Sequence, residues 1–487
     1  MTFARILITL LLTLPFAASA TQTRSRGLGL STDTSWMVQG QYPYLFLNPA
    51  AVNDYRNFIY FEHQLNSVSI EENSGGVFFN PYDKLTFGFL TGLPVNQKVF
   101  NDSANPRSLF YSSGTNLISN NVIFDLNNAI ITANGLSLAE SFNLYDVSRN
   151  EFNNRNINTV LGYEMSNLQL GALIGYGYVK DNQSRANLLK EYIRLFKSET
   201  SVTAGARYQK NLWRFESIDL AYSMVLYDLN NNYDSTDIDG LRIAASLTDD
   251  AAQDHSIFVK TSFRLHRRHL LHLSYRFASY RTATTATAKS EINVPPLLPF
   301  EYVENYSRTG HSHRLGISDE MHPAKTVKVY FGIQVDTESL SNSYDGLDIQ
   351  SGRYRQNPVE ENFNSLFVPV YLGLEGELSK YFTIRFALNH SLHNRPAATY
   401  DREFIDNRRG NTSSANITQT NITTTTGSGG AESNVSLGFT LNFSRFSIDW
   451  LANANFFRDG PHFFSGKVNE LSTALAVSYY FVKGDKK

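Results

Sequence analysis

The sequence predicts an all-β fold, a transmembrane antiparallel β-barrel of roughly 14 to 18 strands with short periplasmic turns and long extracellular loops. Three observations carry this prediction. Aromatic residues make up 13% of the chain, with Tyr 27 and Phe 34, yet its mean hydropathy is −0.29. After residue 20 there is no run of the roughly 18 apolar residues that a membrane helix needs. Instead, apolar and polar residues alternate, as lipid-facing and lumen-facing positions do along a barrel strand.

Residues 1–20 have the features of a secretory signal peptide. Arg5 supplies the positive start, residues 6–16 form a short apolar core, and Ala18-Ser19-Ala20 fits the small-residue cleavage rule. We therefore expect cleavage before Thr21. The rest of the chain divides into an N-terminal periplasmic segment over 21–55, a barrel over 56–483 and a short tail over 484–487.

Composition excludes several classes of protein. With Cys 0, an exported chain has no disulfide framework and no thiolate metal site. A formal net charge of −2 and a pI near 6.6 provide no basic excess for binding nucleic acid. We expect no nucleic-acid partner. The expected partners are the lipid bilayer of a Gram-negative-type outer membrane, the barrel-assembly machinery and a small-molecule solute.

Three segments show the period-two alternation most clearly. A soluble sandwich also alternates, so the number of such segments and the pattern of their links decide between the two folds. In a sandwich the apolar face would form a buried core, and in a barrel it faces lipid. The apolar faces are Val327, Val329, Phe331, Ile333 and Val335; Phe382, Ile384, Phe386 and Leu388; and Val435, Leu437, Phe439, Leu441 and Phe443.

The links between predicted strands alternate between short and long. Short links fall at Arg267-Arg268, Ser379-Lys380 and Ser444, and long polar ones at 283–307, 339–363 and 394–433. Outer-membrane barrels show this asymmetry, and an even strand number keeps both chain ends on the periplasmic side. Strand signals run from about residue 157 to 481, with weaker ones at 58–70, 76–91, 122–131 and 134–145.

Two further segments refine the strand prediction. Pro369 lies inside an apolar strand pattern and cannot donate to a ladder, so a bulge or a locally unpaired stretch is expected there. The segment 471–481, LSTALAVSYYF, resembles the aromatic-ended last strand by which outer-membrane proteins are recognised for barrel assembly. Here the sequence VKGDKK follows Phe481, where that family usually stops.

The lumen face is expected to carry charges of both signs. They would line a water-filled passage or simply solvate and cross-brace the interior. The candidate lumen charges are Lys260, Arg264, Arg276, Lys328, Arg385, Asp336, Glu375, Glu377 and Asp449, with His272 on the same face.

No enzymatic, metal or cofactor site is expected. His311 and His313 share a strand face, and His266, His269 and His272 lie near a turn, but neither group has a carboxylate or thiolate at ligand spacing. Ser312 lies between two histidines, yet adjacent strand residues point to opposite faces, so neither can activate it. We therefore predict a protein that is not an enzyme, with no catalytic residue and no cofactor.

The stretch LNPAAV at 47–52 resembles the Asn-Pro-Ala signature near the N-terminus of long-chain fatty-acid transporters of the bacterial outer membrane, the FadL family, and of related hydrophobic-compound channels. The resemblance implies that Asn48, Pro49 and Ala50 belong to an N-terminal hatch that plugs the barrel. It also implies that apolar substrates bind at external loops and leave sideways into the membrane. An ordinary turn into the first strand is the alternative reading of the triplet.

A second feature agrees with a hydrophobic solute. The predicted external loop 292–306 would expose an apolar cluster as a landing site, or would fold onto the rim and bury it. Its residues are Val294, Leu297, Leu298, Phe300 and Tyr302. The predicted function is an outer-membrane channel for small hydrophobic molecules. The alternatives are a general porin for small hydrophilic solutes and a surface-binding or structural barrel that acts through its long loops.

Overall fold

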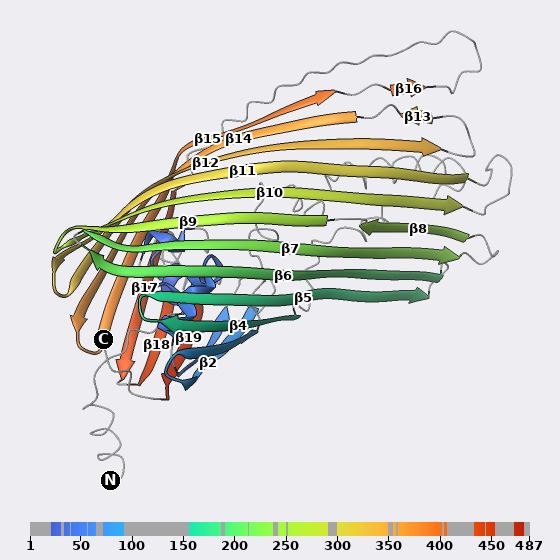
Figure 1. Ribbon diagram of the computed structural model, residues 1–487. Coiled ribbons are helices and arrows are strands. Elements are labelled where there is room, and N and C mark those ends of the chain that lie inside the picture. The colour runs from blue at the N-terminus through green and yellow to red at the C-terminus, as the bar shows by residue number, and fades with distance from the viewer. Residues whose placement is uncertain are drawn as a thin grey trace, which may run out of the picture.

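The structure is a computed structural model of the chain, and it describes most of residues 21–91 and 155–481 (Figure 1). Within these ranges, the residues outside the description are 31–33, 39, 56, 65–71, 187–189, 213, 237–241, 250–251, 291–299, 349–353, 357–358, 402–403, 407–432, 444 and 453–471. The predicted signal peptide, the tail and the weaker strand signals at 122–131 and 134–145 also lie outside the described residues. No helix in the described part is long and apolar enough to cross a membrane.

The described chain is built almost entirely from strands. The first group is β1 (Phe58–Gln64), β2 (Glu72–Tyr82), β3 (Leu85–Thr91), β4 (Arg155–Met165), β5 (Leu168–Ala186), β6 (Lys190–Leu212), β7 (Phe215–Thr236), β8 (Arg242–Asp249), β9 (Ala252–His266) and β10 (His269–Ser290). The second group is β11 (Phe300–Ala324), β12 (Val327–Asp348), β13 (Tyr354–Gln356), β14 (Val359–Ser379), β15 (Phe382–Asp401), β16 (Phe404–Asp406), β17 (Ser433–Phe443), β18 (Phe446–Ala452) and β19 (Ser472–Tyr480).

These segments form one closed antiparallel barrel of 16 strands. Three of its strands are interrupted: β8 continues into β9, β13 into β14 and β15 into β16, because each pair shares the same neighbours. The barrel closes where β1 pairs with β19 on one side and with β2 on the other, from Phe58 opposite Tyr480 to Gln64 opposite Ala474. The predicted fold class and strand number are confirmed.

Side chains alternate between an apolar outer face and an enclosed inner face. On β12, Phe331 is 47% exposed and Val335 is 40% exposed on the outside, whereas Tyr330 and Gln334 on the inside are buried. The apolar faces predicted for residues 326–336 and 382–388 therefore face lipid. Exposed apolar side chains in such numbers are stable in contact with lipid hydrocarbon. In a soluble sandwich the same side chains would have to be buried in a core.

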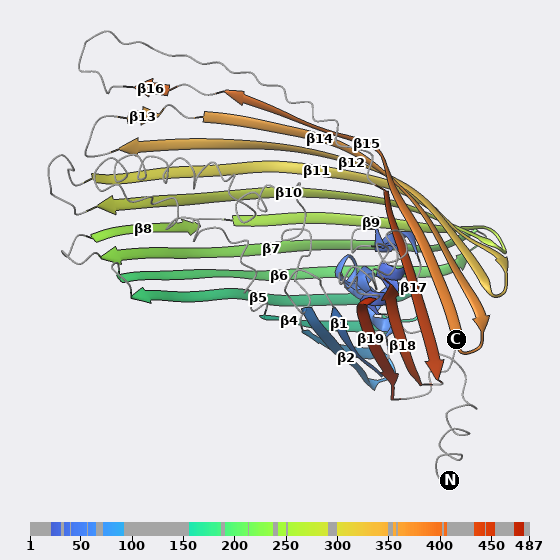
Figure 2. The same cartoon turned by 180° about the vertical axis from the view of Figure 1, so that it is seen from behind.

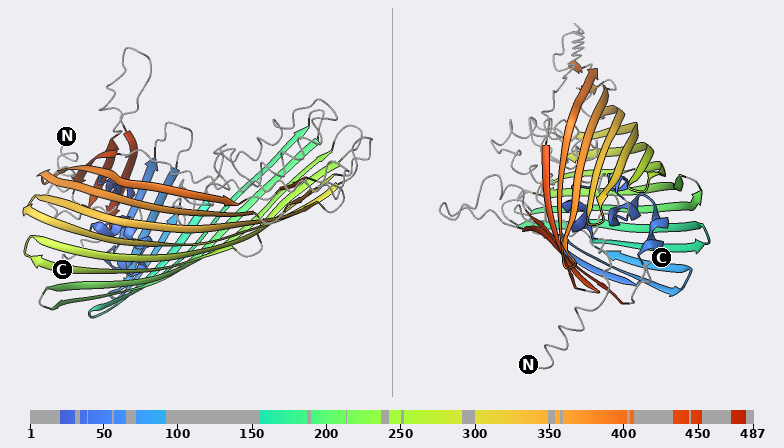
Figure 3. Two further views of the ribbon diagram at one scale, coloured as in Figure 1. Left: turned by 90° about the horizontal axis from the view of Figure 1, so that it is seen from above. Right: turned by 90° about the vertical axis from the view of Figure 1, so that its left-hand side faces the viewer.

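One side of the barrel is far taller than the other (Figures 1 and 2). Strands β5 to β15 include members of 23 and 25 residues, β6 and β11, while β1 and β18 have 7 residues each. A membrane crossing needs only about 9–11 residues per strand. The long strands therefore continue well beyond the membrane as a curved wall (Figure 3).

The wall corrects the predicted loops. The 283–307, 339–363 and 394–433 links are shorter than expected, because β10 continues to Ser290, β12 to Asp348 and β15 to Asp401. Phe300 and Tyr302 consequently belong to β11 and not to a loop. The upper parts of these long strands are rich in Ser, Thr and Asn and lack the apolar alternation of a lipid-facing strand. Their sequence therefore resembles that of a loop. Val294, Leu297 and Leu298 lie outside the described residues.

The predicted short turns and the irregularity at Pro369 are confirmed. β9 ends at His266 and β10 begins at His269, and β14 ends at Ser379 and β15 begins at Phe382. The register between β14 and β15 shifts between Val368 and Pro369. This is the bulge that a residue without a backbone N–H requires inside a ladder.

The outer face generates a depth-dependent prediction. Phe331 lies at the centre of the apolar outer run of β12, and Thr337 lies just beyond its end. We expect Phe331→Arg to lower the free energy of unfolding from lipid vesicles by about 2–4 kcal/mol, and Thr337→Arg by about 0–1 kcal/mol. Denaturant titration in vesicles measures both. Equal losses at the two positions would contradict the assignment of Phe331 to the lipid face.

Candidate functional site

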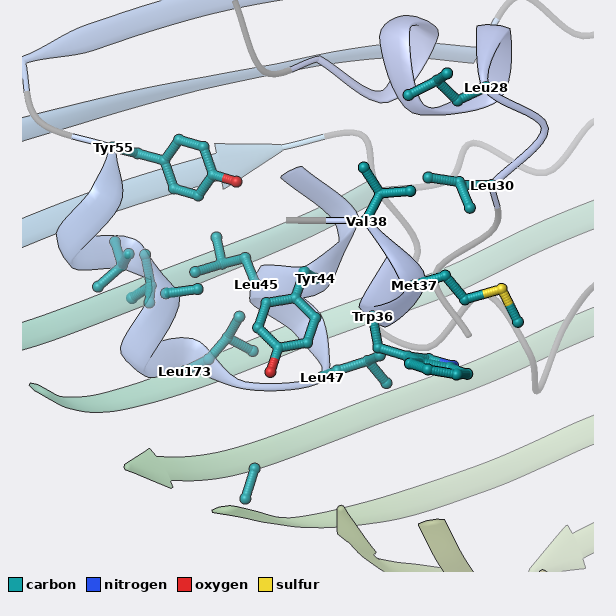
Figure 4. Close-up of a cluster of buried hydrophobic side chains, with 14 of the residues drawn as sticks. Leu28, Leu30, Trp36, Met37, Val38, Tyr44, Leu45, Leu47, Tyr55 and Leu173 are labelled. Atoms are coloured by element: carbon teal, nitrogen blue, oxygen red, sulfur yellow. The ribbon is translucent and has the colours of Figure 1, made fainter. Parts of the chain in front are cut away.

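The lumen holds the N-terminal segment 21–55, called the lumenal segment below. It contains one α-helix and three 3-10 helices, α2 (Gln22–Gly27), η1 (Ser35–Met37), η2 (Tyr42–Phe46) and η3 (Pro49–Asp54). In Figure 2 these helices lie in the enclosed space between β17–β19 and the long strands. The apolar side chains of the lumenal segment form one buried cluster with inward residues of the wall (Figure 4). The members from the segment are Leu28, Leu30, Trp36, Met37, Val38, Tyr44, Leu45, Leu47, Ala51, Val52 and Tyr55.

Glycines in the wall make room for the lumenal segment. A Cβ at Gly171 of β5 would collide with the backbone of Pro49 and Ala50, and one at Gly205 of β6 with the Asn48 side chain. The same holds at four more wall positions that face this segment: Gly162 beside Val52 and Asn53, Gly316 beside Trp36, Gly332 beside Met37 and Gly438 beside Gly27. Close approach of two backbones is what glycine permits. The wall and the segment therefore fit each other over six strands.

The Asn-Pro-Ala triplet starts η3. The Asn48 side chain accepts a hydrogen bond from the Ala50 N–H at 3.1 Å, and Pro49 occupies the first helical position, where its missing N–H costs nothing. The Asn48 amide also donates to Asp219 at 3.0 Å and to the Ala206 carbonyl at 3.2 Å, and the residue is fully buried. The triplet thus caps η3, and the Asn48 side-chain amide also binds β6 and β7 of the wall by hydrogen bonds.

A charged cluster around the buried Arg207 side chain holds the C-terminal end of the lumenal segment; the Asp54 side chain in this cluster is 40% exposed. The Arg207 guanidinium of β6 donates to Asp219 of β7 at 2.6 Å and to Asp54 of the segment at 2.7 Å. The guanidinium also lies 5.6 Å from the ring centroid of Tyr44, and the Lys260 ammonium lies 4.8 Å from the same ring. One wall arginine therefore binds two carboxylates, of which one belongs to the wall and one to the segment.

A second charged cluster holds the N-terminal end. Arg24 of α2 lies 3.3 Å from Glu375 of β14, and Arg385 of β15 donates to the same carboxylate at 2.6 Å. Arg385 continues through Thr440 to Asp449 of β18, which accepts a hydrogen bond from the Thr21 hydroxyl at 2.7 Å. Two strands along the same wall, past β19, Thr23 donates to Glu62 of β1 at 2.6 Å. The first turn of α2 is thus attached to one continuous side of the barrel, from β14 through β18 to β1.

Electrostatics keep the segment's own groups in defined protonation states. Burial by itself would lower the pKa of Arg24, but the carboxylates of Glu375 and Asp449 outweigh it and raise that pKa, so the guanidinium stays charged. Burial raises the pKa of the Tyr44 phenol and that of the Tyr55 phenol, so both stay neutral. Arg24 therefore carries a permanent charge, and the two tyrosines stay neutral among the apolar side chains of the cluster.

Neutral hydrogen bonds fix the middle of the lumenal segment. The Trp36 indole donates to Gln334 at 3.1 Å, and Ser318 donates to the Met37 carbonyl at 3.1 Å. The Tyr371 hydroxyl and the Asn389 amide donate to the carbonyls of Leu28 and Gly29 at 2.5 and 2.6 Å. These contacts satisfy backbone groups that a short irregular segment would otherwise leave unpaired.

Apolar and charged side chains are unevenly distributed around the inner wall. Between β1 and β5 most of the buried inward side chains that meet the segment are apolar: Phe58, Tyr60, Phe78, Leu90, Val160 and Leu173. Phe58 stacks with Phe78 at a ring distance of 6.0 Å. The charged anchors Arg207, Asp219, Glu375, Arg385 and Asp449 lie on β6–β18. The segment therefore packs on apolar side chains all around the wall, while most of its charged anchors lie on β6–β18.

The candidate lumen charges fall into three groups. Lys260, Glu375, Arg385 and Asp449 are buried in the lumen around the segment, as is His272. Arg276, Lys328 and Asp336 are half-buried on the same inner face. Arg264 and Glu377 have the inner-face alternation but lie next to the short turns, where both are exposed. Inside the lumen, the structure brings the candidates Glu375, Arg385 and Asp449 together with Arg24 and Thr21.

The histidines separate as strand geometry requires. Ser312 faces inward and is buried, whereas His311 and His313 are exposed on the outer face. Among the described residues, no group of three or more His, Asp or Glu side chains is placed to hold a metal ion.

Several anchoring residues were missed at the sequence level. Arg24, Asp54, Arg207 and Asp219 did not appear among the candidates, although Arg207 and Asp219 have the inward phase of their strands. The glycines at 162, 171 and 205 share that phase on three successive strands, which is a readable signal for something packed against the wall.

Comparisons with solved structures find barrels at low similarity. The CymD monoaromatic hydrocarbon channel matches at 10% identity over 96% of this chain and 99% of that chain, with a TM-score of 0.39. The Pseudomonas putida toluene transporter TodX matches at 10% identity over 80% and 97%, with a TM-score of 0.30. The ferric yersiniabactin uptake receptor FyuA of Yersinia pestis matches at 9% identity over 87% and 80%, with a TM-score of 0.32. No family model and no curated protein sequence matches the chain.

The glycine contacts predict how the lumenal segment can be displaced. Gly171→Val places a side chain where Pro49 and Ala50 pass, so η3 cannot seat against β5. We expect amide hydrogen exchange over residues 48–54 to accelerate by about tenfold or more, as local opening becomes easier. The control is Gly376→Ala, whose Cβ meets only Ile384 at an ordinary 3.7 Å. Unchanged exchange in Gly171→Val would contradict the packing of η3 against this strand.

The ion pairs predict unequal costs for two arginines. Arg207→Met leaves Asp219 buried without its guanidinium, so we expect the free energy of unfolding to fall by about 3–5 kcal/mol. Arg264 is the matched control, because it makes a 2.7 Å pair with Glu216 while its side chain is 48% exposed. Arg264→Met should cost about 0–1 kcal/mol. Denaturant titration in vesicles compares the two, and similar losses would show that the Arg207 cluster is not an anchor.

Proposed function

We propose that this protein is an outer-membrane channel that admits small hydrophobic molecules, and that its lumenal segment acts as a hatch. One observation carries the proposal. Residues 21–55 pack a continuous apolar cluster into the lumen, against inward apolar side chains of the wall, six of which lie on β1–β5 and five on β7–β15. A solute that follows this route would meet aromatic and aliphatic side chains, which is the lining that apolar ligands require. Asn48, Pro49 and Ala50 would serve as the part of the hatch that docks on β5–β7.

The charge distribution favours this function over a general porin. A porin needs charged side chains that project into open water at its constriction. In this lumen Glu375 and Arg385 bind each other and Arg24, and Arg207 binds Asp219 and Asp54. These charges are engaged in holding the segment, so they support a closed lumen.

The orientation follows from the strand ends. An even number of strands places both ends of the barrel sequence, near Phe58 and Tyr480, on the side of the short turns. In an outer membrane that side is periplasmic, and the long strands then project outward from the cell. The exported chain would reach this membrane through the barrel-assembly machinery, guided by its aromatic-ended last strand.

The tall wall supports a second candidate function, which is surface binding. Strands of up to 25 residues carry the sheet far beyond the bilayer on one side. A partner that contacts this wall would act without passage of a solute. The two functions differ in whether removal of the hatch changes permeability.

Deletion of residues 21–55 tests the hatch. We expect the intact mature protein to be silent in a planar bilayer and the deletion variant to give steady conductance steps, because the lumen of a sixteen-strand barrel is wide enough for water once it is emptied. Retained heat-modifiable migration in electrophoresis confirms that the variant still forms a barrel. Large steps from the intact protein would identify an open porin and contradict the proposal.

The same two proteins decide the solute class. In cells that lack their own channels, the intact protein should increase uptake of toluene but not of arabinose, since only the apolar solute can pass along the wall of β1–β5. The deletion variant should admit both. Equal exclusion of toluene and arabinose by the intact protein would leave surface binding as the better function.

A further inference from the structure

The outer face of β7–β11 carries a cluster of histidines at one depth of the barrel. On β9, β10 and β11 the outward side chains are apolar up to one level, after which polar ones begin; on neighbouring β7 they stay apolar further, to Leu226 opposite Gln253. The last apolar residues are Ile257 on β9, Phe277 on β10 and Leu315 on β11. The next outward residues are His255, Ser279 and His313, followed on β11 by His311. This level is the edge of the hydrocarbon on the long-strand side.

Two of these histidines are held by tyrosines from the apolar belt below. The Tyr222 hydroxyl lies 2.7 Å from Nδ1 of His255, and the Tyr275 hydroxyl lies 2.9 Å from Nδ1 of His313. In each pair the tyrosine comes from the preceding strand of the barrel and its ring lies next to the imidazole, at 6.1 and 6.2 Å between centroids. With Nδ1 engaged, Nε2 is the nitrogen of each ring that remains for a ligand; His313 is exposed and His255 is half-buried.

The strand register gathers the cluster into a compact patch. His255 pairs with Ser279, which pairs in turn with His311, so the three residues share one row across β9, β10 and β11. Two strand spacings separate the outer members, which is about 10 Å. Arg281 follows Ser279 on the same face and is exposed, opposite Thr309 of β11. His311 and His313 have ring centroids 5.5 Å apart.

The chemistry of this patch suits an anion at the membrane surface. It offers a guanidinium, a hydroxyl and imidazole nitrogens, which are donors that phosphate oxygens accept well. The outward residues at this level of β9, β10 and β11, within 253–259, 275–281 and 309–315, include no Asp or Glu. The patch lies just above side chains that contact lipid tails, where a lipid headgroup must lie.

We propose that Arg281, Ser279, His255, His311 and His313 bind the phosphorylated headgroup of an outer-leaflet lipid, with its acyl chains along Ile257, Phe277 and Leu315. The orientation in this statement rests on the proposed outer-membrane location; transport of a solute plays no part in it. The two Tyr–His pairs hold the donors at the correct depth. The site is an annular lipid site that ties the base of the tall wall to the membrane surface.

Lipid retention by the purified mature protein tests the site. The delipidated barrel is incubated in detergent with diphosphorylated lipid A or with enzymatically dephosphorylated lipid A, and bound lipid is counted by native mass spectrometry. We expect retention of the diphosphorylated form to exceed that of the dephosphorylated form by about tenfold, the worth of one charge-assisted hydrogen bond. The triple variant Arg281→Gln, His311→Asn, His313→Asn should lose this preference.

Controls separate the site from general effects on the barrel. Thr309→Asn with Thr337→Asn alters neutral outward neighbours and should keep the preference, and Arg281→Lys should keep part of it. Heat-modifiable migration verifies that each variant is folded. An unchanged preference in the triple variant, or no preference in the wild type, would overturn the proposal. Competition by millimolar inorganic phosphate would indicate a free-anion site instead. Toluene uptake by the triple variant should be unchanged, so this outcome is independent of the transport function.

Discussion

The width of the lumen is the constraint on which the rest of this structure depends. A sixteen-strand barrel is too wide for its own inward side chains to fill, so it is either open to water or occupied by another part of the chain. Here residues 21–55 occupy it, and the wall is adapted to them. Glycines at 162, 171 and 205 remove side chains where η3 lies, and Gly438 lets the backbone of Gly27 approach β17. A glycine inside a strand lowers the stability of the sheet when nothing packs against it. Here the packing of the lumenal segment against these glycines offsets that loss.

Buried charges position the segment more than they stabilise it. Desolvation cancels much of the gain from pairs such as Arg207 with Asp219 or Arg385 with Glu375, and an apolar replacement of both partners can be as stable. Apolar surfaces of the segment and wall, by contrast, could slide along each other. A buried guanidinium finds its carboxylates in one arrangement only. Apolar contacts thus supply most of the stability of the packed segment, and the ion pairs fix its position along the wall.

The sequence predicted the barrel because lipid acts on every crossing strand in the same way. Outward apolar residues such as Phe331 and Phe386 repeat with period two, and Pro369 marked the bulge. The sequence did not predict the upper parts of β10–β15, because neither face of a strand needs to be apolar outside the membrane. Phe300 was therefore assigned to a loop. The contacts that anchor the lumenal segment were not predicted for another reason. Arg24 and Glu375 are 351 positions apart in the sequence, and no local pattern indicates such a contact.

The two ends of the lumenal segment play different parts in closing the barrel. Asp54 lies just before β1, so the chain itself keeps it near the wall, and the Arg207 cluster adds orientation to a contact that is already local. Thr21 and Arg24 lie more than thirty residues from β1, and only non-covalent contacts hold them. Loss of the Glu375 and Asp449 contacts would loosen the first turn of α2 and raise its conformational entropy, while Leu28, Gly29, Trp36 and Met37 keep their hydrogen bonds to the wall. The Arg24 cluster thus orients the end of the segment that lies far from β1 along the chain, and the Arg207 cluster orients the end that the chain already ties to β1.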